Sequence, residues 1–247
     1  MKTIPKKIAL ITGAARRIGA EIAGYLHNKD INVVIHYHHS QAEAKQLCQT
    51  LNKKRANSAC ALAADLNDTQ QISLLAKQAI AHWGRLDVLV NNASTFFSTD
   101  FHTATASQWD QCFNTNLKAP FFLSQALADS LKKHAGCIVN IADIHALKPL
   151  HHYSFYSMAK AGLVMMTQSL AKTLAPEIRV NAIAPGSTLW PEGDNQLNDH
   201  AKTKIIAKIP LQQQGSPTHI AHTVDFLIEN SHITGQVITV DGGRSIK

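Results

Sequence analysis

Residues 8–19, with the sequence IALITGAARRIG, decide the fold of this chain. The short apolar run Ile8–Ile11 is typical of a buried strand, and Ile18 and Ile22 then recur with helical spacing. Between them, Gly13 allows a tight turn that brings the backbone close to a pyrophosphate, and Gly19 allows close helix–strand packing. The N–H groups that open such a helix favour anions. The segment therefore predicts a dinucleotide site, although a plain strand–helix turn has the same local pattern.

Outward from this segment, apolar runs alternate with helical patterns along the whole chain. Strands are expected at Ile8–Ile11, Ile31–Ile35, Ala59–Ala63, Leu86–Val90, Cys137–Ile141, Val180–Ile183 and Val237–Val240. Helices are expected near Trp109–Leu131, Tyr156–Leu174 and Thr218–Ile228. This alternation predicts an α/β fold with a doubly wound parallel sheet and helices on both faces. No linker or composition shift interrupts it, so residues 1–247 are expected to form a single domain.

Composition narrows the class of protein. The chain has 247 residues and a net charge of +7, but its basic residues are scattered, so an anionic small molecule explains the charge as well as nucleic acid does. No apolar stretch reaches the roughly 18 residues of a membrane span. Four cysteines without a C-x-x-C pair are typical of free thiols in a reducing compartment, which predicts a cytoplasmic protein: Cys48, Cys60, Cys112 and Cys137.

The end of the second strand distinguishes between the two nicotinamide dinucleotides. An NAD site places Asp or Glu there to bind the ribose 2′-hydroxyl, but Ile35–Ser40 contains no acid. Donors suit a 2′-phosphate, which a carboxylate would repel, so NADPH is predicted. The donors expected around it are Arg16, His36, Tyr37, His38, His39 and Ser40. A metal site is not expected, because His36 and His38 share one strand face while His39 points away.

Two further strand ends are expected to line the cofactor. Asp65 and Leu66 follow the third strand, where an adenine edge can be held. Asn91-Asn92-Ala93-Ser94 follows the fourth strand, and small side chains there allow the cofactor to lie against the backbone.

The pair Tyr156 and Lys160 is the main candidate for catalysis. Residues i and i+4 share one face of a helix, so the lysine ammonium is expected close to the phenol. A phenol of pKa about 10 is a poor acid–base catalyst at neutral pH, and a nearby cation lowers its pKa. The spacing also occurs by chance on ordinary amphipathic helices. Tyr153 is the alternative tyrosine, but Ser157 stands at its i+4 position.

Taken together, these motifs resemble the short-chain dehydrogenase/reductase family along essentially the whole chain. The matching segments are Thr12–Gly19, Asn91-Asn92-Ala93, Asn116, Tyr156-x-x-x-Lys160 and Pro185-Gly186. The resemblance implies a Rossmann-type sheet of about seven strands, with Tyr156 as proton donor, Lys160 on the nicotinamide ribose and Asn116 holding a proton-relay water. It also implies cofactor contacts from Gly13, Arg17, Ile18, Gly19, Asn92, Ala93, Ser94, Pro185, Gly186 and Ser187.

Three departures from the family pattern narrow the resemblance to the pteridine reductases. Arg17 replaces the middle glycine of the turn, Ser94 replaces a glycine and is followed by Phe96, and Asp143 replaces the serine 13 residues before Tyr156 (156 − 13 = 143). A carboxyl group can relay protons and bind amino groups of a nitrogen heterocycle. The resemblance implies a pterin between Phe96 and the nicotinamide, contacts from Arg17 and Ser94, and protons supplied by Asp143 and Tyr156. Biopterin, dihydrobiopterin and dihydrofolate are the expected substrates.

The remaining expectations rest on likeness to the same family. Residues 187–214 correspond to the mobile substrate loop and carry Trp190, Pro191 and Gly193 among polar residues. Gly162 and Val240–Gly243 resemble oligomer-forming parts, which implies a homotetramer. Three alternatives stay open at this point: a carbonyl reductase such as a 3-oxoacyl-[acyl-carrier-protein] reductase, a dihydromonapterin reductase, and a cofactor-binding regulator or nucleic-acid binder without catalysis. Asp143 counts against the first, and the intact Tyr156/Lys160 pair against the last.

Overall fold

A single parallel sheet forms the centre of the computed structural model, which describes residues 6–192 and 196–246. Its seven strands lie in the order β3-β2-β1-β4-β5-β6-β7. They are β1 (Ile8–Ile11), β2 (Asn32–Tyr37), β3 (Ala59–Ala63), β4 (Val88–Asn91), β5 (Cys137–Ile141), β6 (Arg179–Pro185) and β7 (Val237–Val240). The α/β class and the seven strands predicted from sequence are confirmed, with β2 and β4 shifted toward the carboxyl end and β6 longer at both ends.

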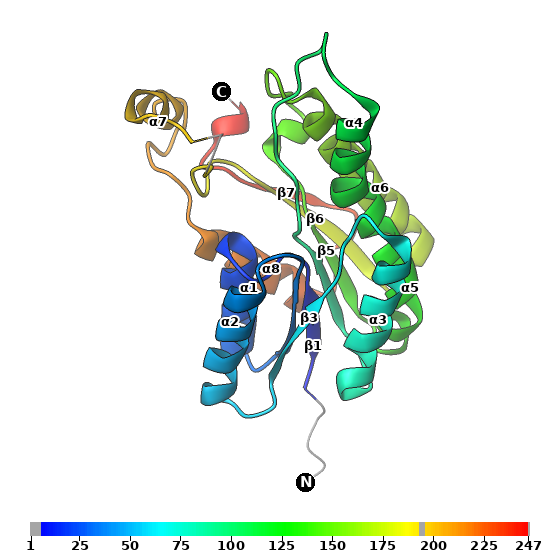
Figure 1. The fold of residues 1–247 in the computed structure, drawn as a ribbon. Coiled ribbons are helices and arrows are strands. Elements are labelled where there is room, and N and C mark those ends of the chain that lie inside the picture. The colour runs from blue at the N-terminus through cyan, green and yellow to red at the C-terminus, as the bar shows by residue number, and fades with distance from the viewer. Residues whose placement is uncertain (1–5, 193–195, 247) are drawn as a thin grey trace.

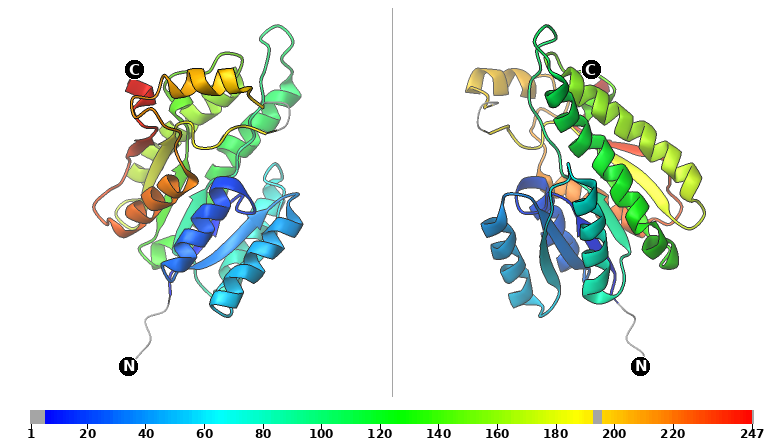
Figure 2. Two further views of the ribbon diagram at one scale, coloured as in Figure 1. Left: turned by 90° about the vertical axis from the view of Figure 1, so that its left-hand side faces the viewer. Right: turned by 45° about the vertical axis from the view of Figure 1, so that its right-hand side comes forward.

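Helices cover both faces of the sheet, as Figures 1 and 2 show. They are α1 (Arg17–Asn28), α2 (Gln41–Lys54), α3 (Thr69–Trp83), α4 (Ala106–Phe113), α5 (Ala119–Lys133), α6 (Ser154–Leu174), α7 (Asp199–Ile206) and α8 (Pro217–Glu229). One face carries α1, α2 and α8, and the other carries α3, α5 and α6 (Figure 1). Among the helices that the structure describes, none has the length and apolarity needed to cross a bilayer.

The apolar strand runs are continuous because both faces of the sheet are buried. Successive side chains of a strand point to opposite faces. Ala9 and Ile11 accordingly pack in the core beneath α1 and α8, whereas Ile8 and Leu10 pack in the core beneath α3 and α5. All four cysteines are free thiols, and three of them are buried.

The expected single helix near Trp109–Leu131 is interrupted. A π-helical segment, η1 (Asn114–Lys118), separates α4 from α5, and the Ala119 N–H donates to the Asn114 carbonyl oxygen five residues back. Short π-helical insertions within α-helices are often found at functional sites. Apolar periodicity did not reveal this one, because one wider turn leaves the flanking apolar spacing nearly unchanged.

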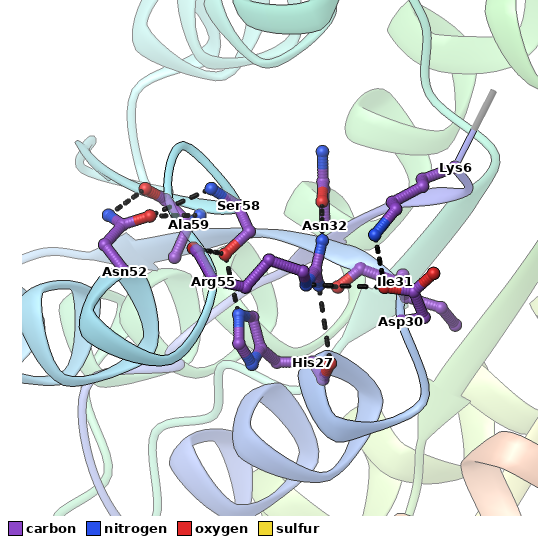
Figure 3. Close-up of polar contacts among 9 residues, drawn as sticks. All are labelled: Lys6, His27, Asp30, Ile31, Asn32, Asn52, Arg55, Ser58 and Ala59. Carbon is purple, nitrogen blue, oxygen red and sulfur yellow. Dashed lines mark hydrogen bonds and ion pairs between the residues drawn. The ribbon is translucent and has the colours of Figure 1, made fainter. Parts of the chain in front are cut away.

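A polar cluster closes the end of the sheet opposite the carboxyl ends of the strands (Figure 3). Arg55 donates to the Ile31 carbonyl oxygen at 2.8 Å and also to the Asn32 side chain. The buried His27 lies with Nε2 2.7 Å from the Ser58 hydroxyl, and its pKa is lowered first by burial and then by the charge of Arg55. These contacts join the end of α1 to the starts of β2 and β3, so this end of the sheet is structural.

Candidate functional site

The candidate site lies at the carboxyl ends of the strands, where the sheet changes direction. β1 pairs with both β2 and β4, so the chain order reverses between β1 and β4. In doubly wound sheets, ligands bind at this switch point. The segments that follow β1, β4, β5 and β6 therefore meet at the upper end of the molecule in Figure 1.

The glycine turn after β1 needs its glycines for close backbone approach. Gly13 has φ +61°, and a Cβ on it would lie 3.0 Å from the Ala93 Cα. A Cβ on Gly19 would overlap the Gly13 carbonyl oxygen and lie 2.5 Å from the Asn92 amide nitrogen. Helix α1 begins at Arg17, which has φ +56° although it is not glycine. The turn thus packs tightly on the end of β4, and α1 begins directly after it.

Thr12 and Asn92 hold this turn against β4. The Thr12 hydroxyl oxygen accepts the N–H groups of Asn92 and Ala93 at 2.9 and 3.0 Å. The Asn92 amide donates to the carbonyl oxygens of Thr12 and Gly13 at 2.8 and 3.1 Å. The side chain of Asn92, which we expected at the cofactor, therefore shapes the turn. Sequence analysis gave Thr12 no role of its own, and its position directly after a buried strand was the available signal.

His36 has a different position from the one we expected of a phosphate donor. Its Nδ1 accepts the Gly13 N–H at 3.1 Å, and its Nε2 donates to the Ala64 carbonyl oxygen at 3.1 Å. Burial lowers the pKa of His36 to about 4. The neutral ring is thus engaged at both nitrogens and fastens the glycine turn to the end of β3, which leaves it no donor for a 2′-phosphate.

His38 and His39, which follow β2, are exposed. The rings of His38 and His39 lie 3.6 Å apart between centroids, while Tyr37 is buried and its hydroxyl accepts from the Gln41 side chain. His38 Nε2 lies 4.0 Å from the Asp65 carboxylate. The fold thus brings one acid near the end of β2 that is remote in sequence. The Asn67 N–H and side-chain amide bind that carboxylate and lower the pKa of Asp65.

The residues present fit the pyrophosphate of a dinucleotide. No acid stands in the first turn of α1, and no described side chain caps its N-terminus. The N–H groups at that end favour a pyrophosphate. Arg16 precedes α1 and is exposed, and Ser40 precedes α2 without capping it, so both side chains are available beside the end of β2. Leu66 is buried beneath this edge.

Asp143, Tyr156 and Lys160 come together above β5. The Tyr156 hydroxyl donates to the Asp143 carboxylate at 2.8 Å. Lys160, 2% exposed, donates to the Ile141 carbonyl oxygen at 2.8 Å and lies 5.7 Å from the centroid of the Tyr156 ring. The Asp143 carboxylate also accepts the His145 N–H at 2.8 Å, which fixes the short 3₁₀ turn η2 (Ile144–Ala146).

The electrostatics of this group correct our expectation that Lys160 makes Tyr156 more acidic. Burial raises the pKa of Tyr156 well above its ordinary value, and the charge of Asp143 and the hydrogen bond to it raise it further. Burial lowers the pKa of Lys160 to about 8, against an opposing effect of Asp143. The expectation was wrong because burial first, and then the adjacent carboxylate, disfavour the phenolate. Tyr156 therefore stays protonated.

Asn116 and Ser94 meet beside this group. The Ser94 hydroxyl donates to the Asn116 side-chain oxygen at 2.6 Å. The Asn116 amide nitrogen donates to the carbonyl oxygens of Thr95 and Cys112 at 3.0 and 2.9 Å. Asn116 is fully buried within η1, so the π-helical turn orients its amide toward the loop after β4.

Phe96 lies against two tyrosines at the mouth of the site. Its ring is stacked on Tyr153 with centroids 4.4 Å apart and an interplanar angle of 16°. It meets Tyr156 edge-on at 4.9 Å and 83°. Phe96 is 37% exposed. Sequence analysis considered Tyr153 only as a rival catalyst, but the structure gives it a packing role beside Phe96.

Arg17 and the end of β6 connect the site to the loop that follows. The Arg17 guanidinium donates to the Trp190 carbonyl oxygen at 3.0 Å and forms an ion pair with Glu192 at 2.6 Å. Arg17, which we expected at the cofactor and the pterin, therefore contacts the expected substrate loop. Residues 193–195 of that loop, including Gly193, lie outside the described residues.

The sequence places this chain among known reductases and dehydrogenases. Residues 13–245 match the family model described as enoyl-(acyl carrier protein) reductase. The chain is 35% identical to pteridine reductase 1 of Leishmania tarentolae, over 97% of this chain and 96% of that protein. It is 34% identical to the 3-oxoacyl-[acyl-carrier-protein] reductase FabG of Staphylococcus aureus, over 96% and 97%. It is 31% identical to glucose 1-dehydrogenase 2 of Bacillus subtilis, over 99% and 97%.

Proposed function

The chain belongs to the short-chain dehydrogenase/reductase family, and on this basis we propose that it uses NADPH to reduce a ring C=N bond of a pteridine. Biopterin, dihydrobiopterin and dihydrofolate are the candidate substrates. The observation that carries the proposal is the 2.8 Å hydrogen bond from Tyr156 to Asp143, where the family pattern has a serine. A hydroxyl at this position suits a carbonyl oxygen, whereas a carboxylate can accept hydrogen bonds from the amino groups of a nitrogen heterocycle.

We propose the following roles for the residues of the site. NADPH, when bound, supplies the hydride. Tyr156 stays protonated at neutral pH and donates its proton to the reduced ring nitrogen. Asp143 accepts a hydrogen bond from the Tyr156 hydroxyl in the resting site and relays protons to Tyr156. Lys160 binds the nicotinamide ribose, and its ammonium stabilises the phenolate left behind.

The substrate is proposed to lie flat against Phe96, which is partly exposed and held by Tyr153. Aromatic rings favour such stacking on a planar heterocycle. Ser94 and Arg17 flank the position from the loop after β4 and from the glycine turn. Asn116 would hold a relay water beside Ser94, and this role is compatible with its fixed amide.

The cofactor is proposed to lie across the carboxyl ends of β1, β4 and β6. The glycine turn and the start of α1 would hold the pyrophosphate, and the segment after β2 the adenosine and its 2′-phosphate. The proposed contact residues are Gly13, Arg16, Arg17, Ile18, Gly19, His38, His39, Ser40, Asp65, Leu66, Ala93, Ser94, Pro185, Gly186 and Ser187. We propose that His36, Tyr37 and Asn92 affect cofactor binding only indirectly, through the shape of the site.

The rest of the chain supports a single reductase domain with residues 187–214 as its substrate loop. The two ends of this loop meet, because the Gly215 N–H donates to the Ser187 carbonyl oxygen at 2.9 Å. Arg17 contacts the loop through Trp190 and Glu192, and these contacts support the assignment of the segment as a substrate loop. We further propose a cytoplasmic location, in keeping with four free cysteines.

The decisive experiment is NADPH oxidation by the purified protein with biopterin, dihydrobiopterin, dihydrofolate and acetoacetyl thioester in parallel. We expect turnover with the pterins. Tyr156→Phe should lose at least about a hundredfold in kcat because it removes the proton donor, with NADPH affinity retained. Asp143→Ser should impair pterin reduction more than NADPH binding.

Two outcomes would contradict the proposal. Preferential reduction of the thioester would make the chain a carbonyl reductase like the FabG relative. Retention on nucleic acid with no NADPH oxidation by any of the four substrates would exclude the enzyme proposal. Activity on dihydromonapterin, added as a fifth substrate, would keep the chemistry but change the physiological pterin.

A further inference from the structure

The direction of the hydrogen bonds at Asn116 is fixed by its neighbours. The side-chain nitrogen of Asn116 lies 3.0 Å from the Thr95 carbonyl oxygen and 2.9 Å from the Cys112 carbonyl oxygen. Carbonyl oxygens have no proton to donate, so the nitrogen of the amide, and not its oxygen, must face them. Asn116 is fully buried, and the π-helical segment η1 carries its backbone. The side-chain oxygen of Asn116 therefore points the other way, where a buried acceptor requires a donor.

Ser94 supplies that donor. Its hydroxyl oxygen lies 2.6 Å from the Asn116 side-chain oxygen, which can only accept, so the proton between the two oxygens belongs to Ser94. A hydroxyl has a single proton and two lone pairs, so Ser94 can only accept any further hydrogen bond. Turning the hydroxyl away would remove this hydrogen bond from a buried oxygen, which is costly. Ser94 itself is exposed, so a ligand can reach it.

This hydrogen-bonded pair lies beside the proposed reaction centre. Cys112, whose carbonyl oxygen accepts from the Asn116 amide, belongs to the same small apolar cluster as Tyr156. Phe96 stands two residues after Ser94, and its ring meets the Tyr156 ring edge-on. The acceptor at Ser94 is therefore next to the aromatic side chain on which the substrate is proposed to stack.

Asp143 has the same hydrogen-bond polarity as Ser94. The two residues stand three positions after Asn91 and Asn140, which are paired in the adjacent strands β4 and β5. The Asp143 carboxylate accepts a hydrogen bond from the Tyr156 hydroxyl, and an ionised carboxylate has no proton to donate. The loops after β4 and β5 therefore both present acceptors at the proposed substrate position.

We propose that Asn116 is a positioning residue that fixes Ser94 as a hydrogen-bond acceptor, so that the site selects a heterocycle presenting an amino group to Ser94. The 2-amino group of a pterin has this polarity, whereas the oxygen of a 2-oxo pteridine would face the Ser94 lone pairs. For the same reason, Ser94 can accept a hydrogen bond from a ribose hydroxyl but cannot donate one to a phosphate. The identity of the substrate rests on the proposed function, but the fixed direction of the hydrogen bond from Ser94 to Asn116 does not.

Binding to the protein loaded with NADP⁺ tests this selection without turnover. Fluorescence titration compares pterin with pteridine-2,4-dione, which has an oxygen in place of the 2-amino group. The wild type should bind pterin at least about tenfold more tightly, because an acceptor that faces an acceptor is left unpaired. Ser94→Ala should reduce this preference at least about threefold, whereas Ser94→Thr keeps the hydroxyl and should retain it. Ser98→Ala, at an exposed position of the same loop, is the control and should bind both compounds like the wild type.

Asn116→Ala tests the positioning role in the same titrations. This variant keeps Ser94 but frees its proton to rotate, so the affinity for pteridine-2,4-dione should rise relative to that for pterin. Loss of packing alone would weaken the binding of both compounds by the same factor. In turnover of dihydrobiopterin with NADPH, Ser94→Ala should raise KM about tenfold and change kcat by less than about twofold, because the hydride donor and Tyr156 are unchanged.

The ratio of the two affinities decides the proposal. Equal wild-type affinities for pterin and pteridine-2,4-dione, or an unchanged preference in Ser94→Ala, would overturn the selection by Ser94. An unchanged ratio in Asn116→Ala would overturn the positioning role of Asn116. Absence of wild-type turnover with any pterin would refute the proposed function and leave the binding ratios to decide on Ser94 and Asn116.

Discussion

At the scale of single residues, Asp143 changes what its neighbour can do. A serine in its place would leave Tyr156 with a neutral partner. The carboxylate instead accepts a hydrogen bond from the Tyr156 hydroxyl at 2.8 Å and, after burial, raises the pKa of Tyr156. Tyr156 therefore keeps its proton in the resting site, with Lys160 one helical turn away.

Lys160 should give the enzyme a basic limb in its pH profile. Burial lowers the pKa of Lys160 to about 8, so the ammonium is present below that pH and is lost above it. We therefore expect kcat/KM for the pterin to fall as pH rises through about 8. Initial rates measured across this pH range test the expected fall in kcat/KM. Constant kcat/KM well into the alkaline range would show that the Lys160 charge is not needed.

Arg16 should contribute to the preference for NADPH. It is exposed beside the start of α1, and a guanidinium binds a phosphate through charge-assisted hydrogen bonds. Arg16→Gln should weaken NADPH about tenfold or more while changing NADH affinity little. Fluorescence titration with both dinucleotides measures this. Equal wild-type affinities would refute the 2′-phosphate argument itself, whereas an equal loss for both dinucleotides would assign Arg16 to the pyrophosphate.

The sequence predicted which side chains gather at the site better than it predicted their contacts. Tyr156 and Asp143 were identified from spacing, and the structure brings them together. The sequence could not show that His36 turns inward while His38 stays near the surface, because alternation along an extended segment would place both on the same face. Burial by the glycine turn separates them, and that turn is a tertiary feature.

At the scale of elements, the glycine turn, β2 and β3 depend on one another through His36. Its ring accepts the Gly13 N–H and donates to the Ala64 carbonyl oxygen. No strand pattern predicts such a link. The strands themselves were predictable, because full burial requires continuous apolar runs, whereas the π-helical turn η1 leaves no comparable signal in the sequence.

This link should make the fold sensitive to acid. The pKa of His36 is 6.5 when unfolded and about 4 when folded, so the unfolded chain binds the proton first as pH falls. Stability is therefore lost between these values, by about 3 kcal/mol at pH 4 from this group. His36→Gln should flatten that dependence, whereas His82→Gln at an exposed position should keep it. Denaturant unfolding at several pH values measures it, and a wild-type profile in His36→Gln would exclude His36 as the cause.

At the scale of the whole molecule, the amino ends and the carboxyl ends of the strands differ in their roles. The polar cluster around Arg55 joins the amino ends of β2 and β3 with hydrogen bonds (Figure 3). The carboxyl ends carry loops, a π-helical turn and the C-terminal 3₁₀ turn, and the proposed cofactor and substrate sites lie there. Side chains with altered pKa values that the proposed reaction uses, Tyr156 and Lys160, lie at the second end.

One outer face of the molecule should be covered by another copy of the chain. Partly exposed aromatic and apolar side chains gather over α4, α5 and α6, and Trp109, Phe121 and Phe122 line a groove there with Leu117. A contiguous apolar patch of this kind marks an interaction site. Gly162 supports close packing beneath it, because a Cβ there would lie 2.8 Å from the Leu117 side chain. We expect a homotetramer that uses this face.

Light scattering coupled to size exclusion tests the assembly. The wild type should elute with the mass of four chains, and Phe121→Glu combined with Phe122→Glu should reduce it, because two carboxylates cannot be buried in an apolar contact without partners. Leu74→Glu changes an apolar side chain of similar exposure on α3 and should leave the mass unchanged. A monomeric wild type would refute the assembly. A double variant that stays tetrameric would show that the interface lies elsewhere. The apolar face over α4, α5 and α6 would then not carry the contacts that hold the tetramer together.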